Sequence, residues 1–353
     1  MKERDFELAC PAPLRHRTVQ LAHGGGGRLS RELIEQVFMP AFGGAALSAR
    51  HDGAVVRAPS GRIAMTTDGY VVRPLFFPGG DIGKLAICGT INDLAMTGAT
   101  PRWLAVAFVL EEGLPMEDLV RVVGSMRDAA RAAGVEIVTG DTKVVDRGKG
   151  DKMFVTTTGV GVVPEGIEIE PRSVRPGDAV LVSGDLGRHG IAVLSVREGL
   201  TLTGALESDC APLDGLVSAL LAANVGIHCL RDPTRGGLAS ALNEIAMDGG
   251  VDIEIDESSV PVNEAVAGAC ELFGLDPLYV ACEGRLVAFV PQEHAARSLD
   301  VMRAHPAAPA PALIGTVLGP ADPARRGRVT LRSRIGTSRL LDIPAGEQLP
   351  RIC

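Results

Sequence analysis

The chain has 353 residues, of which 46% are apolar, 22% charged and only 3% aromatic, and its formal net charge is −8. This length suggests two domains, and the composition is that of a soluble globular protein with a core of Ala, Val, Leu and Ile. The negative charge argues against a nucleic-acid-binding protein, which needs a basic face. No apolar run of about 18 residues occurs, so the sequence predicts no membrane span.

The seven cysteines are odd in number and include no C-x-x-C pair. This pattern argues against a disulfide framework and against a zinc site built from local ligands. Cys88, Cys229, Cys270 and Cys282 lie in apolar surroundings and are expected in the core. The charged N-terminal segment is followed by no apolar core of signal-peptide length, so we expect a cytoplasmic protein.

The first half of the chain predicts an α+β domain over residues 21–165, preceded by a loose leader over 1–20. Asp81 is a good N-cap for a helix that runs to about Met96. Further helices are expected at about 30–38 and 116–133, and strands at 62–67, 103–110, 135–139 and 153–163.

A polar, turn-rich linker then leads into a second α+β domain, expected over residues 166–334. Its helices are predicted near 189–197, 212–223, 235–247, 263–273 and 292–304. Its strands are predicted near 179–182, 251–255, 279–282, 285–290, 312–318 and 328–332. Beyond Arg334 the periodicity is lost, which predicts a mobile tail over 335–353.

The tail ends in Cys353, a thiol at a free carboxyl terminus, where it is badly placed for core packing. The last eleven residues could reach about 36–40 Å when extended. Pro344 and Pro350 favour such extended conformations. A thiol placed in this way suits the carriage of a chemical group between two sites, and an unpaired cysteine without function is the simpler alternative.

Four consecutive glycines, Gly24, Gly25, Gly26 and Gly27, expose backbone N–H groups that can wrap phosphate oxygens. A flexible hinge is equally compatible with this run. The run is neither a Walker A motif nor a Rossmann fingerprint.

Four acidic residues are candidates for a metal site. Asp68 and Asp141 follow predicted strands, Asp232 begins a predicted helix, and Asp93 lies within an apolar helix where an unpaired charge is costly. Aspartates also cap helices and turns, and that alternative stays open for Asp232. Carboxylates gathered from strand ends and helix starts are what Mg²⁺ requires, with nucleotide phosphates completing its shell.

Lys143 and Glu283 are charged residues in apolar settings. From position alone, a catalytic role and a structural ion pair are about equally compatible with each.

Several of these segments together resemble a known superfamily. Thr-Thr-Asp-Gly at 66–69, Asn-Asp-Leu-Ala-Met at 92–96, Gly-Asp-Thr-Lys at 140–143 and Asp-Pro-Thr-Arg-Gly-Gly at 232–237 are similar to motifs of the aminoimidazole ribonucleotide synthetase-like (PurM-like) ATP-binding proteins. Selenophosphate synthetase and thiamine-monophosphate kinase belong to that superfamily. Residues 71–86 and the ending Pro350-Arg351-Ile352-Cys353 resemble more specifically the HypE family of hydrogenase maturation factors.

The resemblance extends from Leu21 to Cys353, and Cys10 has no role in it. It implies a two-domain α+β PurM-like fold with a flexible C-terminal tail, and a homodimer formed through the N-terminal sheets. It also implies an ATP-dependent carbamoyl dehydratase, in which a carbamoyl group on the thiol of Cys353 becomes a thiocyanate. A HypF-like carbamoyltransferase would load the thiol, and a HypC–HypD complex would accept the cyanide for the iron of nickel–iron hydrogenase.

The resemblance also assigns roles to individual residues. Asp68, Asp93 and Asp232 would hold Mg²⁺, and Lys143 and Glu283 would act with Cys353 in catalysis, as charge stabiliser and general base. ATP would be bound by Gly24, Gly25, Gly26, Gly27, Lys84, Asn92, Asp141 and Thr142.

Two other functions remain compatible with the sequence. One is a different PurM-like kinase or synthetase, and the other is a non-enzymatic scaffold that docks through its tail. Selenium chemistry would require cysteine or selenocysteine, and lysine, beside the glycine loop, and 24–28 contains neither. Deletion of Cys353 separates the three, because only the HypE-like enzyme would be abolished.

Overall fold

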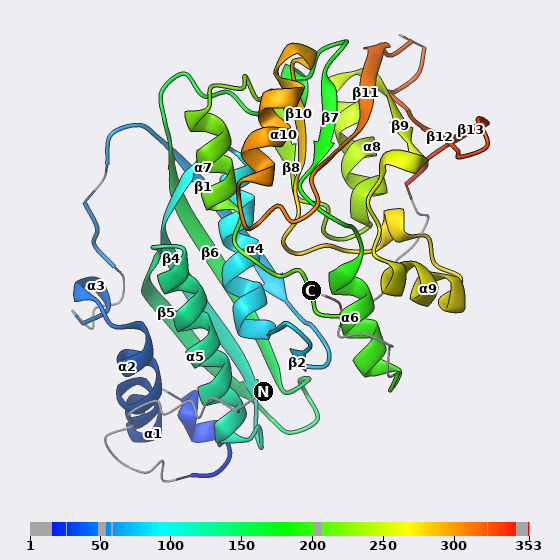
Figure 1. The fold of residues 1–353 in the computed structure, drawn as a ribbon. Helices are drawn as coiled ribbons and strands as arrows, with labels where there is room; N and C mark the ends of the chain where they lie inside the picture. Colours follow the sequence, from blue (N-terminus) through cyan, green and yellow to red (C-terminus); the bar gives the residue numbers. More distant parts are fainter. Residues whose placement is uncertain are drawn as a thin grey trace.

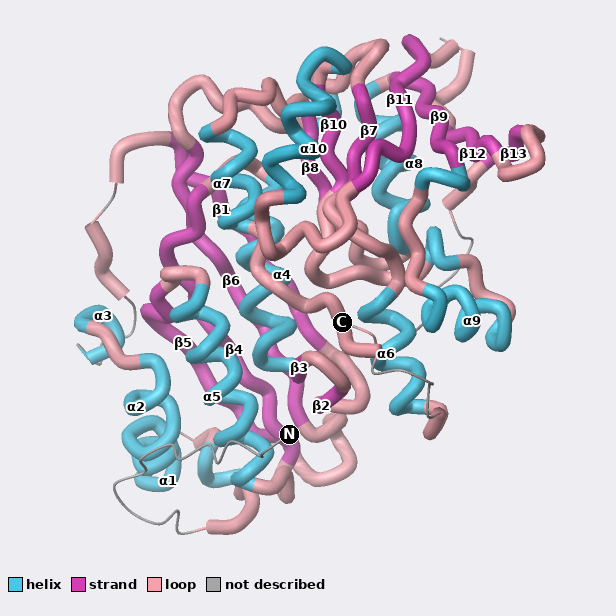
Figure 2. Tube along the Cα trace, viewed as in Figure 1, coloured by secondary structure: helices cyan, strands magenta, loops and turns pink. Residues whose placement is uncertain are grey.

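The computed structural model of the protein describes residues 16–25, 27–48, 54–57, 59–200, 206–322, 324–343 and 352. Two main sheets organise the chain, one in each half, with helices packed against them (Figures 1 and 2). This confirms the predicted two-domain α+β fold. Cys10, Gly26 and Cys353, together with residues 1–15 of the predicted leader and 344–351 of the predicted tail, lie outside the described residues.

The first sheet has four strands in the order β1-β6-β4-β5. They are β1 (Arg62–Tyr70), β6 (Met153–Val163), β4 (Thr100–Glu111) and β5 (Glu136–Val145). Only the β4–β5 pair is parallel. Alternate residues of β4, such as Val106 and Phe108, are buried, which is the period-2 pattern of a sheet covered on one face. Helices α4 (Ile82–Met96) and α5 (Met116–Ala132) cover that face (Figure 1).

Helix α4 is the central element of the molecule, since it contacts the first sheet, α5 and, from the second half, α7. Asp81 caps it as predicted, because its Oδ1 accepts hydrogen bonds from the backbone N–H groups of Gly83 and Lys84. All of its 15 residues except Lys84 and Asp93 are buried. The helix therefore brings Asn92 and Asp93 to the junction between the two domains.

The opposite face of the first sheet is apolar and open in the described part of the chain. Met65, Ile63 and Val109 expose 69%, 56% and 36% of their surface there. Apolar side chains along neighbouring strands of one face form a contiguous patch, and such patches usually mark an interface.

Helical segments at the N-terminal end lie over the β5 edge of this sheet (Figure 1). They are η1 (Leu21–His23), α1 (Arg28–Leu33), the π-helical segment η2 (Ile34–Phe38), α2 (Met39–Phe42) and α3 (Ala45–Ser48). The predicted helix at 30–38 is thus part of a longer run. Its π-helical turn is a rare geometry that often occurs at functional sites.

The second sheet has seven strands in the order β13-β12-β9-β11-β7-β10-β8. They are β7 (Ala179–Val182), β8 (Cys229–Arg231), β9 (Val251–Asp256), β10 (Val287–Val290), β11 (Ala312–Pro320), β12 (Val329–Arg332) and β13 (Ser338–Leu340). Its helices are α6 (Arg188–Arg197), α7 (Asp214–Ala222), α8 (Gly237–Gly249), α9 (Glu264–Phe273) and α10 (Ala295–Arg303). Short 3₁₀ turns are η3 (Pro171–Ser173), η4 (Glu257–Ser259), η5 (Pro277–Tyr279) and η6 (Gln292–His294).

Both faces of the second sheet are covered. Val180 and Val182 of β7 pack in one apolar cluster with α8, whereas Leu181 packs in another with α7 and α10. The result is a helix–sheet–helix sandwich, which explains why all four residues of β7 are buried and apolar.

Several predicted elements differ from the structure. The strand predicted at 279–282 is wrong: Pro277 fixes a 3₁₀ turn that the Asp276 side chain caps, and a loop follows it. Strands β2 (Phe76–Phe77), β3 (Gly80–Asp81) and β8 were not predicted, because they are too short for a periodic signal. Strand β13 lies within the segment predicted as tail and pairs with β12. Strand β5 continues past Thr139, so Asp141 lies inside a strand.

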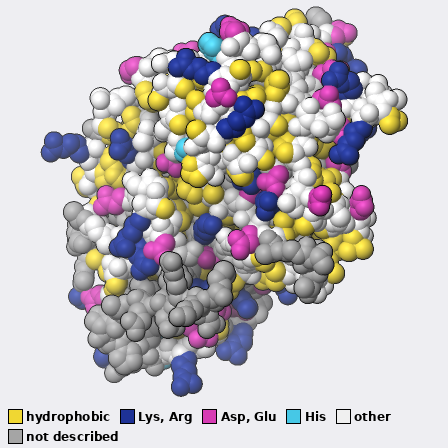
Figure 3. Space-filling model, in the orientation of Figure 1, with side chains coloured by type: hydrophobic (Ala, Val, Ile, Leu, Met, Phe, Trp, Pro, Cys, Tyr) yellow, Lys and Arg dark blue, Asp and Glu magenta, His cyan; other side chains and the backbone are white. Residues whose placement is uncertain are grey.

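The face in Figure 3 carries acidic and basic side chains interspersed, without a large basic patch. Within the described residues, no helix combines the length and the apolarity that crossing a bilayer requires.

The cap that Asp81 forms at the start of α4 should contribute measurably to the stability of the protein. Asp81→Ala should lower the free energy of unfolding by about 1 kcal/mol, because two N–H groups at the start of α4 lose their acceptor. Asp81→Asn keeps an acceptor oxygen and should lose clearly less. Urea unfolding of the two variants measures the difference, and equal losses would contradict a capping role.

Candidate active site at the domain junction

Four of the predicted acidic residues meet where the two domains join. Asp68 comes from β1, Asp93 from α4, Asp232 from the loop after β8 and Glu283 from the loop before β10. Thr66 lies on the same face of β1 as Asp68, and its Oγ1 donates a 2.8 Å hydrogen bond to Asp93 Oδ2. Each of the four carboxylates lies within electrostatic range of at least two others. We call these four residues the acidic cluster.

The carboxylates of the acidic cluster repel one another when they are ionised. Burial, and then the charge of Asp68, raises the pKa of Asp93. Burial and the charge of Asp93 raise the pKa of Asp232 to about 7. Burial and the surrounding carboxylates raise the pKa of Glu283 well above its ordinary value. Arg231 and Arg235 lie close enough to oppose the shift at Asp93, but they do not cancel it.

Glu283 is the most deeply buried of the four, with 3% of its surface exposed. Its Oε1 is buried and accepts no hydrogen bond within the described part of the chain. A buried carboxylate oxygen without a partner is unfavourable in a structural residue and is typical of a functional one.

The main chain around Glu283 is held firmly. Its N–H donates to Asp209 Oδ1 at 3.3 Å, and the next residue, Gly284, packs so closely on the Asp209 carbonyl that an added Cβ would lie 1.9 Å from it. The buried side chain of Arg285 then forms an ion pair with Asp185 at 2.9 Å. The loop therefore presents the Glu283 carboxylate in one fixed direction.

Asn92 and Lys84, both predicted to bind the nucleotide, contact main-chain groups in this structure. The Asn92 amide donates to the carbonyls of Ala211 and Glu283, and its Oδ1 accepts from Leu213 N–H at 2.8 Å. Lys84 Nζ donates to the carbonyl of Gly79 at 2.9 Å. In this structure Asn92 joins α4 to the second domain, next to Glu283.

The acidic cluster fits a divalent cation that is shared with a phosphate. A cation would relieve the repulsion that raises these pKa values and could supply a partner for the buried Glu283 oxygen. Among the residues that the structure describes, no three His, Cys, Asp or Glu side chains converge closely enough to hold a metal alone. Phosphate oxygens would have to complete the shell, as is usual for Mg²⁺.

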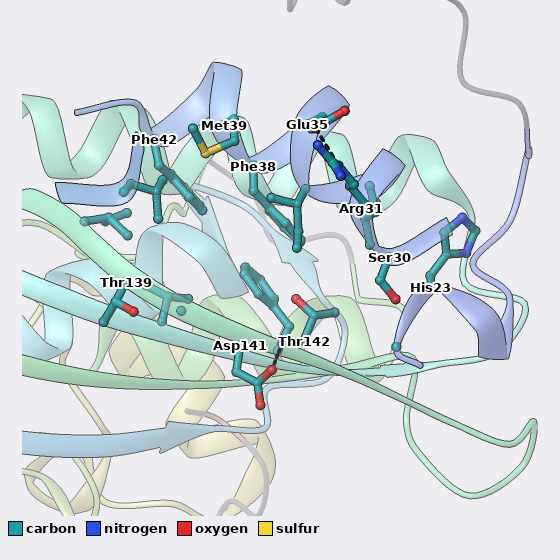
Figure 4. A pocket seen from close by; sticks show the side chains of 18 of the residues that line it. His23, Ser30, Arg31, Glu35, Phe38, Met39, Phe42, Thr139, Asp141 and Thr142 are labelled. Atoms are coloured by element: carbon teal, nitrogen blue, oxygen red, sulfur yellow. Dashed lines mark hydrogen bonds and ion pairs between the residues drawn. The ribbon is translucent and has the colours of Figure 1, made fainter. Parts of the chain in front are cut away.

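A cavity of about 530 Å³ lies between the N-terminal helical segments and β5. Phe38, Phe42 and Ile137 give it an apolar wall, while Thr142 and Asp141 lie on its β5 side (Figure 4). The turns of η2 and α1 form its roof. An apolar slot edged by a few polar groups is the usual form of a small-molecule site.

Gly24 and Lys143 also line this cavity. An added Cβ at Gly24 would lie 2.3 Å from the backbone N of Val144, so only glycine allows this loop to approach β5. Lys143 Nζ forms an exposed ion pair with Asp141 Oδ2 at 2.7 Å. The hydrogen bond from Lys143 lowers the pKa of Asp141.

The predicted site residues thus form two separate groups. Asp68 lies opposite Thr157, which lies opposite Val106, which lies opposite Gly140. Asp68 and Gly140 are therefore three strand spacings, or about 14 Å, apart across the sheet. Asp141 and Lys143 also point to the open face, whereas Asp68 points toward α4.

The structure adds residues that sequence reasoning missed. Ile352, next to Cys353 in the chain, is only 3% exposed, and its carbonyl accepts a 2.9 Å hydrogen bond from His189 Nε2. Ser208 contacts the other side of the His189 ring, and Asp209 reaches the Glu283 loop. No motif surrounds His189, Ser208 or Asp209 in the sequence, so only the fold brings them to Ile352.

Comparison with known proteins agrees with this geometry. Sequence profiles described as AIR synthase related protein match here, the N-terminal domain over residues 50–163 and the C-terminal domain over 175–326. The chain therefore belongs to the AIR synthase-related, PurM-like class.

More specific relatives share nearly the whole chain. It is 54% identical over 340 residues to "Carbamoyl dehydratase HypE" of Azotobacter vinelandii, covering 96% of this chain and 98% of that protein. A crystal structure of the maturation protein HypE in complex with ATP superposes with a TM-score of 0.91 at 47% identity, covering 95% of this chain and all of that one. A chain of a crystal structure of a HypE–HypF complex gives a TM-score of 0.77 at 46% identity, covering 88% of this chain and 99% of that one. The chain is a member of the HypE family.

The raised pKa of Asp232 gives a prediction for the protein without nucleotide or metal. A carboxyl whose pKa is higher in the folded state stabilises the fold below its unfolded pKa, and this stabilisation is lost as pH rises toward about 7. Between pH 6 and 8 the wild type should therefore lose on the order of 1 kcal/mol more unfolding free energy than Asp232→Asn. Urea unfolding at both pH values in a chelating buffer measures this. Identical pH dependence of the unfolding free energy in the two proteins would contradict a raised pKa at Asp232.

Proposed function

We propose that this protein converts a carbamoyl group, carried on the thiol of Cys353, into a thiocyanate at the expense of ATP, and so supplies cyanide for nickel–iron hydrogenase maturation. The observation that carries the proposal is the burial of Ile352 against His189, because Cys353 is the next residue. The other partner of His189, Ser208, precedes Asp209, which binds the loop of Glu283. Membership of the HypE family, whose relatives are named carbamoyl dehydratases, supports it.

The reaction balances without any further reagent. The carbamoyl oxygen attacks the γ-phosphorus of ATP, and the bond from that phosphorus to ADP breaks. The nitrogen then loses two protons, the C–O bond breaks with loss of phosphate, and the carbon–nitrogen triple bond forms. The sum is S-carbamoyl plus ATP giving S-cyano plus ADP, phosphate and two protons. Tethering the substrate to the chain makes the attack intramolecular.

Glu283 would accept a proton from the carbamoyl nitrogen. A carboxylate with a raised pKa is a stronger base than an ordinary glutamate once it is ionised. Its rigid loop and its unpartnered oxygen suit that task. Lys143 would stabilise negative charge on the phosphorylated oxygen.

ATP would contact both groups of site residues, the cavity over β5 from one copy of the chain and the acidic cluster from a second copy. The apolar wall of Phe38, Phe42 and Ile137 suits a purine ring, and the glycine loop beside it suits phosphates. Mg²⁺, when bound, would neutralise phosphate charge, and Asp68, Asp93 and Asp232 are the residues that would hold it.

The separation of Lys143 from the acidic cluster is explained if the active protein is a homodimer. Two copies joined through their open sheet faces, with the two-fold axis parallel to the strands, would place β5 of one copy against β1 of the other. Lys143 of one copy would then lie nearer to β1 of the partner, the strand that carries Asp68, than to β1 of its own subunit. Met65, Ile63 and Val109 would be covered in the same dimer.

The resemblance to the HypE family implies two protein partners. A HypF-like carbamoyltransferase would load Cys353, and the HypE–HypF complex among the similar structures supports this. A HypC–HypD complex would accept the cyanide on iron.

Intact-mass spectrometry tests the function directly. After incubation with carbamoyl phosphate, ATP, Mg²⁺ and the HypF-like partner, the wild type should carry a carbamoyl adduct that loses one water. The Cys353→Ser variant should carry neither form. Turnover of a free metabolite that survives Cys353→Ser would instead favour another PurM-like kinase or synthetase.

Subunit mixing tests the roles of Glu283 and Lys143. Glu283→Gln and Lys143→Ala should each dehydrate the carbamoyl group at least about 100-fold more slowly than wild type. If Lys143 acts on the partner's site, exchange of subunits between the two variants should restore about a quarter of wild-type activity, since half the dimers are mixed and one site of each is intact. Full activity in either variant alone would eliminate its proposed role, and no recovery on mixing would place both residues in one subunit's site.

The dimer itself is tested by Met65→Glu. A charge on the open sheet face should convert the dimer to a monomer in sedimentation equilibrium, because an unpaired buried charge is costly at an interface. Leu272→Glu, at an equally exposed apolar residue on α9, is the matched control and should stay dimeric. A dimeric Met65→Glu variant would contradict this interface.

A further inference from the structure

His189 lies in the first turn of α6 and is fully buried. Its two ring nitrogens have different partners: Nε2 lies 2.9 Å from the carbonyl oxygen of Ile352, and Nδ1 lies 2.8 Å from Ser208 Oγ. The Ile352 carbonyl is 163 residues away in sequence and belongs to the tail that carries Cys353. No role in the proposed chemistry uses this histidine.

The partners of the ring define its protonation. A carbonyl oxygen only accepts hydrogen bonds, so Nε2 must carry a proton and donate it. Burial lowers the pKa of His189, which favours the neutral ring. Nδ1 then accepts from the Ser208 hydroxyl, which in turn accepts from Cys210 N–H at 3.1 Å. Every polar atom in this chain of contacts has a partner of the right kind.

The surroundings of His189 come from both domains. The ring of Phe77, in the β2–β3 hairpin of the first domain, packs edge-on against it at 5.2 Å. Ser208 N–H donates to the carbonyl of Pro78, in the same hairpin. Asp209, the residue after Ser208, accepts from Glu283 N–H. The tail contact is therefore built into the same loops that hold the catalytic carboxylate.

We propose that His189 and Ser208 form a clamp on the main chain of the tail, which fixes how deeply the tail enters and so positions Cys353 at the acidic cluster. The clamp binds a main-chain carbonyl group, so it depends on where the chain lies and not on which side chain the residue carries. Its catalytic part rests on the proposed function, whereas the docking of the tail does not.

The clamp should have opposite effects on the two steps of the proposed reaction, the loading of Cys353 and the dehydration of its carbamoyl group. The tail must be released for Cys353 to be loaded by a partner, and it must be clamped for dehydration. His189 is thus a positioning residue that favours the second state, and its loss should slow dehydration without slowing loading. A mere loss of folding would slow both.

Alkylation of Cys353 by N-ethylmaleimide measures the clamp without any reaction of the enzyme. The full chain with Cys10→Ser serves as parent, because Cys88, Cys210, Cys229, Cys270 and Cys282 are buried. His189→Phe keeps an aromatic ring but removes both polar nitrogens. It should raise the alkylation rate of Cys353 about three- to tenfold, the factor expected for one lost hydrogen bond. His189→Gln keeps an N–H donor near the Nε2 position and should stay within about twofold of the parent.

The matched control is His294→Phe. His294 also contacts a main-chain carbonyl, that of Val225, at 2.8 Å, but it belongs to the 3₁₀ turn η6, just before α10. It should leave Cys353 alkylation unchanged. If His189→Phe unfolds, the five buried cysteines will react as well, and Ser208→Ala then decides, with a smaller rise expected at Cys353 alone.

The outcomes separate the clamp from the proposed function. Faster alkylation and slower dehydration in His189→Phe, with loading unchanged, would support the clamp. An alkylation rate equal to that of the parent, in a wild type that does dehydrate, would overturn the clamp alone. A wild type that never dehydrates the carbamoyl group would overturn the proposed function. The alkylation rates alone would then support or overturn the clamp.

Discussion

The structure depends on one electrostatic constraint, the gathering of four carboxylates at a junction between two domains. Burial and mutual repulsion raise the pKa values of Asp93, Asp232 and Glu283 together. Such an arrangement opposes folding, and a fold retains it only where the charge has a use. A bound cation and the phosphates of a nucleotide would turn this repulsion into binding energy.

The second domain holds that cluster in place through main-chain contacts. Asp209 accepts from the N–H groups of Glu283 and Gly284, and Asn92 of α4 contacts the carbonyl of Glu283. The same short stretch, through Ser208, contacts the histidine that binds the tail. Tail docking, the proposed catalytic base Glu283 and the domain junction are therefore mechanically coupled. A change at any one of them is expected to affect the other two.

The sequence predicted the long elements well, because their patterns are local. The Asp81 cap and the apolar run of α4 gave that helix within a residue at each end. The joining of Asp68, Asp93, Asp232 and Glu283 was also foreseeable, since each residue follows a strand or helix boundary or interrupts an apolar segment. The wrong strand at 279–282 arose because buried loops can be as apolar as strands. The His189 contact was not predictable, because it depends on two segments 163 residues apart.

The most direct test of the central claim is the proton balance when Mg²⁺ and a non-hydrolysable ATP analogue bind. Isothermal titration calorimetry at pH 7, in two buffers of different ionisation enthalpy, measures it. Ionisation of Asp232, whose pKa is about 7, predicts release of at least about half a proton per site, with less in Asp232→Asn. Binding of the nucleotide and metal with no release of protons, in wild type and variant alike, would contradict the account.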